Sequence, residues 1–233
     1  MELTDWTPPE APGPMTLRGR YALLEPLTAA QAPALHAANA ADDRVWRWLA
    51  YGPFATEADY AAWVASVADR PDPRFFAVTD LETPEAGPAG VASLMRIDPA
   101  NGAIEVGHVC FSPRLQRRRA ATEAICLLAA WVFHAGYRRF EWKCDAGNAP
   151  SRRAARRFGF AFEGVFRQHM IVKGRNRDTA WFAMTDRDWP EVEAAHRAWL
   201  DPGNFDGEGR QRDRLGDLTA PAVARAEAEH AGG

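Results

Sequence analysis

The chain has 233 residues, of which 47% are hydrophobic and 25% are charged, and its formal net charge is −3. This composition excludes a disordered or fibrous protein and allows one sizeable α/β domain with a core of its own. No segment reaches the roughly 18 consecutive apolar residues of a membrane span, and residues 1–17 lack the basic and then apolar order of a secretion signal. We therefore expect a cytoplasmic protein with no membrane partner.

The cysteines agree with this expectation. There are three, Cys110, Cys126 and Cys144, an odd number without close pairing and without the His/Cys spacing of a zinc site. We expect reduced thiols, with neither a disulfide framework nor a bound metal.

Basic residues are concentrated in the middle of the chain. Residues 114–157 contain eleven Lys or Arg against three acidic residues, although the whole chain is acidic. Such a segment predicts a polyanionic ligand, either a nucleic acid or a phosphate-bearing cofactor. The alternative is a solvated basic helix face.

The first half of the chain predicts two helices and four strands. Residues 1–14 are rich in Pro and acidic side chains and are expected to form a loose arm or an extended lead-in. Apolar residues interleave with arginines over residues 15–24, which predicts a first strand, and threonines are placed to cap helices over residues 28–39 and 56–70. Three short β-rich runs then predict an antiparallel meander over residues 74–79, 90–97 and 103–111.

The second half predicts a parallel crossover followed by a hairpin. Apolar residues at helical spacing begin at Ala120 and stop before Gly136, which predicts the clearest helix of the chain. Further strands are expected over residues 139–145, 160–172 and 178–184, and further helices over residues 148–159 and 189–200. The predicted organisation is therefore an arm (1–14), one domain (15–200) and an irregular tail (201–233).

The junction between strand 103–111 and the clearest helix predicts a phosphate site. The first N–H groups of a helix have no intrahelical partner and carry the positive end of its dipole, so they can bind a pyrophosphate. Ala120 and Ala121 are small enough to let phosphates approach the backbone. An ordinary helix start is the alternative interpretation.

Motifs along residues 15–190 resemble the GNAT superfamily, and specifically its RimJ/RimL-like N-acetyltransferases. Gln116-x-x-Arg119-x-Ala121 is similar to the Q/R-x-x-G-x-G/A signature that holds the CoA pyrophosphate in this family, with Arg119 in place of a glycine. The opening strand, fourth strand and fourth helix of the family are resembled by Leu17-x-Gly19-x-x-Ala22, Ile104-Glu105-Val106-Gly107 and Asn148-x-x-Ser151.

The resemblance implies an α/β GNAT fold, in which a mixed sheet of about seven strands is flanked by helices and its splayed central strands hold acyl-CoA. It also implies an acetyl-CoA-dependent N-acetyltransferase, whose acceptor is a primary amine of a protein N-terminus or a small molecule that attacks directly in a ternary complex. The cofactor-binding residues that it implies are Phe111, Gln116, Arg117, Arg118, Arg119, Ala120, Ala121, Thr122, Asn148 and Ser151.

The fourth helix of the family often supplies an acid to the leaving thiol. Its tyrosine lies four residues before the glycine of the pair that is Gly159-Phe160 here, and this position is Ala155. The resemblance leaves Asn148 and Ser151 to hydrogen-bond the CoA arm or sulfur, with Ser151 as a catalytic candidate. Helix capping is the alternative for Asn148, because Asn is a favoured N-cap residue.

Amine acetylation requires an amine that has lost its proton, whereas a thiolate with a pKa near ~8.5 leaves with little help. Glu105 is the candidate base, because it lies on the strand that leads to the proposed cofactor loop. The alternative is a carboxylate that orders the sheet. His108 would point to the opposite face of an unbulged strand, so we expect it to pack or to lie at the surface.

Two other functions are open at this point. An acyl-CoA-binding protein without catalysis fits Arg119 and Ala155, and a nucleic-acid-binding protein fits the basic segment, although it leaves the Gln116 and Asn148 motifs unexplained. We therefore do not expect a nucleic acid partner. Lys173, Arg175 and Arg177 at the hairpin tip would steer an acidic substrate, and nine tryptophans leave room for a homodimer.

Overall fold

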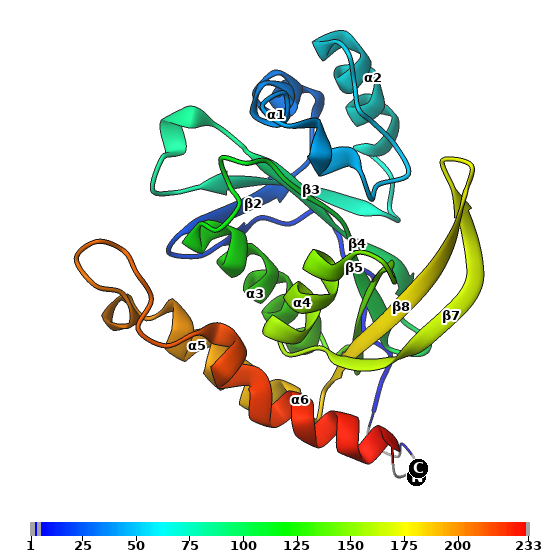
Figure 1. Cartoon of the computed structure of the whole chain (residues 1–233), viewed down its shortest axis with the longest axis vertical. Coiled ribbons are helices and arrows are strands. Elements are labelled where there is room, and N and C mark those ends of the chain that lie inside the picture. The colour runs from blue at the N-terminus through cyan, green and yellow to red at the C-terminus, as the bar shows by residue number, and fades with distance from the viewer. Residues whose placement is uncertain (1–2, 4–5, 232–233) are drawn as a thin grey trace.

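One mixed sheet of eight strands runs through the computed structural model, which describes residues 3 and 6–231 (Figure 1). Its strand order is β1-β2-β3-β4-β5-β6-β8-β7. The strands are β1 (Leu17–Arg18), β2 (Ala22–Pro26), β3 (Arg74–Asp80), β4 (Gly90–Asp98), β5 (Ala103–Phe111), β6 (Arg139–Asp145), β7 (Ala161–Val172) and β8 (Arg175–Thr185). The helices are α1 (Ala32–Asn39), α2 (Glu57–Val67), α3 (Arg119–His134), α4 (Ala149–Arg157), α5 (Trp189–Leu200) and α6 (Leu215–Ala231). This mixed α/β architecture confirms the predicted fold class.

The expected first strand is divided into β1 and β2 by a bend at Gly19, which adds one strand to the seven expected. At this bend the Glu123 carboxylate of α3 accepts hydrogen bonds from the N–H groups of Arg20, Tyr21 and Ala22, at 3.0, 2.6 and 2.6 Å. A Cβ at Gly19 would overlap the carboxylate. The glycine therefore lets a buried acid fix α3 to the edge of the sheet.

β5 and β6 form a parallel pair, and α3 is the crossover between them. Their neighbours β4 and β8 are antiparallel to them. After α3 the chain reverses through Gly136, whose φ of 94° is a left-handed conformation that glycine adopts without strain. The predicted long helix and parallel crossover are both confirmed.

The sheet buries a core on each face. One core, which includes Ile104 and Phe182, is covered by α3, α4 and α5. The other, which includes Tyr60, Phe75 and Cys110, is covered by α1 and α2 on the opposite side of the sheet (Figure 1). β5 contributes to both cores, with Ile104 and Val106 in the first and Cys110 in the second.

β7 and β8 form a long hairpin that extends past the rest of the sheet (Figure 1). Two shifts of register interrupt its pairing, the second between Phe166 and Met170, and such irregularities bend a hairpin. At the tip, Lys173 Nζ donates a hydrogen bond to the carbonyl of Trp46 at 3.1 Å. Trp46 ends the short 3-10 turn η2 (Asp43–Trp46), so the hairpin closes onto the segment between α1 and α2.

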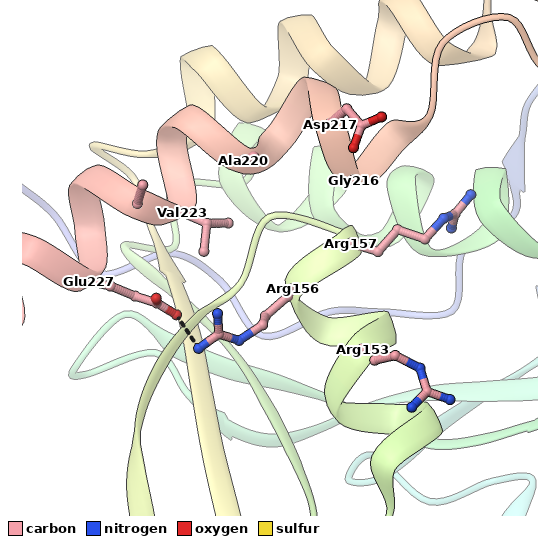
Figure 2. Close-up of a pocket in the computed structure, with 9 residues that line it drawn as sticks. Arg153, Arg156, Arg157, Gly216, Asp217, Ala220, Val223 and Glu227 are labelled. Carbon is pink, nitrogen blue, oxygen red and sulfur yellow. Dashed lines mark ion pairs between the residues drawn. The ribbon is translucent and has the colours of Figure 1, made fainter.

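The prediction of an irregular tail over residues 201–233 is wrong where α6 lies. The buried side chains of α6 include Leu215, Thr219 and Ala222, and the helix packs against α4 and α5. Figure 2 shows α6 crossing the end of α4, where Arg156 and Glu227 form an ion pair of 2.9 Å. Most of the Gly, Asp and Arg residues that suggested irregular structure lie in residues 201–214, before α6. Residues 232–233 of the predicted tail lie outside the described residues.

The predicted arm is described for residue 3 and residues 6–14, and its residues 1–2 and 4–5 lie outside the described part. The described arm is attached to the domain by hydrogen bonds. Trp6 Nε1 donates to the carbonyl of Gly136 at 3.2 Å, and Arg74 Nε donates to the carbonyl of Pro12 at 2.8 Å. The described part of the arm contains no helix or strand, and it contacts two parts of the domain.

Within the described residues, no helix has both the length and the apolar character that crossing a membrane requires. All three cysteines are buried and unpaired. The same residues contain no group of three or more His, Cys, Asp and Glu arranged to hold a metal ion.

Candidate functional site

β5 and β6 separate in the middle of the sheet. Their parallel pairing runs from Ala103 and Arg139 to Val106 and Trp142. A cavity of about 1340 Å³ opens beyond the last pair, between the separated strands. The predicted splay of the central strands is confirmed.

The cavity extends from the start of α3 to the β7–β8 hairpin. Its lining comes from both halves of the chain. It includes the segment between α1 and α2, the ends of β4 and β6, much of β5, the starts of α3 and α4, and parts of residues 199–211. Every predicted site residue except Ala120 lines it. Ala120 is instead fully buried in the core below the first turn of α3.

The start of α3 is open toward the cavity. Its N-cap residue, Arg118, makes no side-chain capping hydrogen bond. The Gln116 side chain donates from Nε2 to the carbonyl of Phe111 at 2.8 Å and so closes the loop that precedes the helix. The N–H groups of the first turn are thus placed to bind an anion, with the dipole of a 16-residue helix behind them.

Arg119, at the glycine position of the signature, is the first residue of α3 and needs no glycine conformation. The left-handed residue of the loop is Arg117, with φ of 62°. The Arg119 side chain pairs with Glu82, and its guanidinium lies 4.7 Å from the ring of Tyr21 and 4.9 Å from that of Phe205. Arg119 lines the cavity, and its charge is held between Tyr21, just before β2, and Phe205 of the C-terminal segment.

Much of the positive charge of residues 114–157 is neutralised by acids from other parts of the chain. Ion pairs join Arg118 to Asp80, Arg119 to Glu82, Arg139 to Glu163 and Arg156 to Glu227. All four acids lie outside the segment. These ion pairs reduce the excess of positive charge that suggested a nucleic acid, because the fold brings distant acids to four of the arginines.

The start of α4 brings Asn148 and Ser151 to the cavity wall. Asn148 is the N-cap, and its Oδ1 accepts a hydrogen bond from the N–H of Ser151 at 3.2 Å, so the capping interpretation describes this oxygen. The Ser151 Oγ accepts a hydrogen bond from Trp142 Nε1 at 3.0 Å. Both side chains are held in place by the protein itself, as groups that orient a ligand must be.

α4 turns Ala155 away from the cavity. Ala155 is fully buried in the core that α3 also covers, whereas Ser151, Ala154 and Phe158 line the cavity. In this structure the residue that lines the cavity at this turn of α4 is thus Ala154, while the position expected for a tyrosine acid is buried. None of the described residues that line the cavity is a tyrosine.

Glu105 belongs to a buried network of charges. Its side chain is 7% exposed and forms ion pairs with Lys143 Nζ at 2.9 Å and Arg96 Nε at 3.5 Å. Lys143 also pairs with Glu141 at 2.7 Å. Burial raises the pKa of Glu105, while the positive charges of Lys143 and Arg96 act against this rise. A carboxyl with a raised pKa holds an accepted proton more firmly than an exposed one.

β5 contains a β-bulge. The side chain of His108 was expected to point away from Glu105 on an unbulged strand, and this expectation is wrong. Val91 pairs with Cys110 and Ser93 with Gly107, which leaves His108 and its neighbour opposite a single residue of β4. His108 has φ of 51°. The extra residue turns its ring to the same face as Cys110 and Glu105.

There the ring of His108 lies 4.8 Å from that of Phe75 and 5.6 Å from that of Tyr51, between centroids. Burial lowers the pKa of His108 to about 4. It is therefore a packing residue, as expected, but one that also lines the cavity.

Two parts of the site were missed in the sequence. Arg157, on the last turn of α4, donates from Nη2 to Thr122 Oγ1 at 3.0 Å, and its guanidinium lies 5.1 Å from the ring of Trp199. The C-terminal segment after α5 closes this end of the cavity, where Trp199 Nε1 donates to Gln211 Oε1 at 2.8 Å. No spacing pattern in the sequence connects residues that lie so far apart along the chain.

The comparisons with known proteins agree with this geometry. The acetyltransferase (GNAT) domain model matches residues 22–161, and no curated protein matches the chain. A crystal structure of a GCN5-related N-acetyltransferase from Brucella melitensis is 48% identical, with a TM-score of 0.90 over 94% of this chain and 100% of that chain. A probable GNAT-family acetyltransferase from Chromobacterium violaceum is 42% identical, with a TM-score of 0.76 over 82% and 96%.

A more distant structure shares the fold alone. It is the microcin C7 self-immunity acetyltransferase MccE in complex with acetyl-CoA and AMP, which is 21% identical, with a TM-score of 0.64 over 72% of this chain and 93% of that chain. The family model covers more than half of the chain, and the Brucella structure is similar over its full length. The chain therefore belongs to the GNAT family of acyl-CoA-dependent acetyltransferases.

Proposed function

We propose that this chain is an N-acetyltransferase that transfers the acetyl group of acetyl-CoA to a primary amine by direct attack in a ternary complex. The observation that carries the proposal is that one cavity joins the open start of α3 to the buried carboxylate of Glu105. A phosphate site and a candidate base thus face the same space. The motif order around Asn148 and Ser151 supports a RimJ/RimL-like enzyme.

The residues at the α3 end fit the phosphates of CoA. The N–H groups of residues 117–122 offer donors, and Arg157 is a half-buried cation with no acidic partner among the described residues. Burial lowers the pKa of Arg157, which indicates that its charge is only partly compensated within the protein. Asn148 and Ser151 would hold the arm of CoA, and the complex of MccE with acetyl-CoA supports acetyl-CoA as the donor.

In the proposed reaction the amine nitrogen forms a bond to the acetyl carbon, the carbon–sulfur bond breaks, and Glu105 takes the proton from the amine directly or through water. Lys143 and Arg96 keep Glu105 charged before the transfer, and burial favours its protonated form afterwards. The thiolate, with a pKa near ~8.5, needs little acid to leave. A hydrogen bond from Ser151 to the sulfur would then be sufficient help.

The test combines binding and turnover. Thermal shift and calorimetry with acetyl-CoA, CoA and ATP measure selectivity, and thiol release with a panel of amines measures transfer, with the acetylated product identified by mass. Selective stabilisation by acetyl-CoA together with amine-dependent thiol release is the expected result. Binding without release from any amine would establish a non-catalytic acyl-CoA-binding protein. No response to acetyl-CoA would refute the proposal, and salt-dependent RNA or DNA binding would then favour a nucleic-acid-binding protein.

The proposal includes a cytoplasmic homodimer. The free, buried cysteines support a reducing compartment. Cell fractionation tests the location, and light scattering of the purified chain tests the dimer.

A further inference from the structure

Arg177 lies on the wall of the cavity that also holds Glu105. It is on β8, two and four residues before Thr179 and Trp181, so the three side chains share one face of the strand. The ring of Trp181 lies 3.6 Å from Lys143 Nζ, and Lys143 pairs with Glu105. Arg177 is therefore on the face of the sheet where the candidate base lies, at the end nearer to the hairpin tip.

Arg177 is a cation without a partner. No hydrogen bond or ion pair joins its guanidinium to any other described residue, and its Nε is buried without an acceptor. An unpaired donor of this kind destabilises the folded chain unless something binds it. The exposed basic residue at the tip, Lys173, is instead used to close the hairpin onto Trp46.

Most of the other charged groups at this end of the cavity have partners of their own. Arg44 pairs with Asp42 at 2.7 Å, and Arg47 lies over the ring of Trp48 at 5.0 Å. Asp145 Oδ1 accepts a hydrogen bond from the N–H of Gly147 at 2.8 Å. The charges of the network around Glu105 cancel, because it contains three carboxylates and three cations. The carboxylates are Glu105, Glu141 and Glu163, and the cations are Arg96, Arg139 and Lys143. Asp145, which pairs with Thr179 in the register of β6 and β8, forms no ion pair among the described residues, and none joins any of these carboxylates to Arg177.

A guanidinium presents its N–H groups in a planar fork that matches a carboxylate or a phosphate. The phosphates of an acyl-CoA have a separate site, since the open start of α3 and Arg157 lie together at the other end of the cavity. Thr179 and His169 line the cavity with Arg177, and they would surround the acceptor. The Nδ1 of His169 lies 2.9 Å from the Oγ1 of Thr179.

We propose that Arg177 binds a carboxylate of the acceptor, so that the preferred substrates are primary amines that carry a carboxylate in the same molecule, as free amino acids do. This inference rests on the proposed function and specifies its substrate class. Arg177 acts as a specificity residue, which fixes the acidic end of the acceptor while the amine is directed toward Glu105. Lys143, which lies between them, is already neutralised by two glutamates.

The experiment compares matched acceptors and matched variants. Thiol release is measured with amino acids and with their amides, with kcat/KM expressed per unprotonated amine because the two amines differ in pKa. The variants are Arg177→Met, Arg177→Lys and, as the control, Arg175→Met, which changes an exposed arginine of the same strand. We expect the wild type to prefer the carboxylate acceptors by about ten- to hundredfold, as is typical of a charge-assisted hydrogen bond.

In Arg177→Met the KM for carboxylate acceptors should rise until the preference disappears, with the activity on amides and the affinity for acetyl-CoA unchanged. Arg177→Lys should retain part of the preference, and Arg175→Met all of it. Equal activity of the wild type on acids and amides would overturn the inference while leaving the acetyltransferase intact. A loss of acetyl-CoA affinity in Arg177→Met would also overturn it, because Arg177 would then bind the donor.

A binding measurement decides the inference if no amine is acetylated. With CoA present, thermal shift compares an N-acetylated amino acid with its amide on the wild type and on Arg177→Met. Stabilisation by the acid alone that disappears in Arg177→Met supports the carboxylate site even when the proposed function has failed. Equal responses to both compounds refute it.

Discussion

Arg157 Nη2 donates a hydrogen bond to Thr122 Oγ1, at 3.0 Å, and so joins the end of α4 to the first turn of α3. This contact places a cation beside the open N-terminus of α3. Because a helix N-terminus and a guanidinium both favour an anion, the two act on the same ligand. The relationship makes Arg157 the strongest candidate for a side chain that contacts the phosphates of acetyl-CoA.

Arg157→Met should weaken acetyl-CoA binding by about ten- to hundredfold, since hydrogen bonds to charged groups contribute about 1.5–3 kcal/mol. Calorimetry measures the dissociation constant. The matched control is Arg156→Met on the same turn of α4, because Arg156 pairs with Glu227 on α6 (Figure 2). The control should bind acetyl-CoA as the wild type does and lose at most about 1 kcal/mol of stability. Equal affinities of the two variants would exclude a phosphate contact for Arg157.

Glu105→Gln should lower kcat by roughly 10²- to 10⁴-fold, the usual contribution of a general base. Glu105 accepts a proton only when ionised, so activity should fall as the pH drops through its pKa, which burial raises above the ordinary value. The variant should lose this pH dependence together with the rate. Rate–pH profiles of thiol release under acetyl-CoA saturation make the measurement.

Glu141→Gln is the control for the charge network. It removes the other carboxylate that pairs with Lys143, but Glu141 does not line the cavity. Its kcat should stay within about tenfold of the wild type, with the pH profile retained. If both glutamine variants lose the same activity and keep the same profile, Glu105 orders the sheet rather than accepting the proton.

The strands and helices of this fold could be predicted because their signals are local. The alternation over β6 and the helical spacing over α3 are both present in short windows of sequence, and both elements lie within a residue of the predicted place. The splay of β5 and β6 came from the family resemblance and was confirmed. A short window of sequence shows how often apolar residues recur. This period distinguishes a helix from a strand when one face of the element is buried.

The features that could not be predicted depend on pairing between distant residues. The bulge at His108 is a difference between the numbers of residues on β4 and β5, so β5 alone does not reveal it. In the sequence Glu123 is a polar residue near a helix start, and only the fold brings the three N–H groups beside Gly19 to it. Arg157 and Arg177 lie among other arginines in the sequence, and only the fold shows which of these cations have acidic partners.

The stability of the chain should fall in mild acid because of His196. Its Nε2 lies 2.9 Å from the carbonyl of Phe158, its Nδ1 is buried without a partner in the described structure, and burial lowers its pKa to about 4. An unfolded histidine has a pKa near ~6.5. Between these values the unfolded state binds the proton more readily, so stability declines as the pH drops below ~6.5 and the decline ends near pH ~4.

The full effect of His196 is about 3 kcal/mol, at about 1.4 kcal/mol for each pKa unit. Urea unfolding at a series of pH values from 7.5 to 4 measures it, and His196→Gln should show a smaller decline than the wild type. His134→Gln, which changes a histidine with a 65% exposed side chain, should decline as the wild type does. Parallel curves for all three proteins would show that His196 is not the group responsible.

Tyrosine substitutions at two adjacent positions of α4 test which side of the helix faces the cavity. Ala155 is fully buried in the core, so Ala155→Tyr should overpack it and lower the stability by at least about 1–3 kcal/mol. Ala154 lines the cavity, so Ala154→Tyr should fold with a melting temperature close to that of the wild type. Because a thiolate leaves with little acid assistance, the new hydroxyl should not raise kcat. A stable Ala155→Tyr would contradict the orientation of α4, and a marked gain of kcat in Ala154→Tyr would show that departure of the thiol limits the rate.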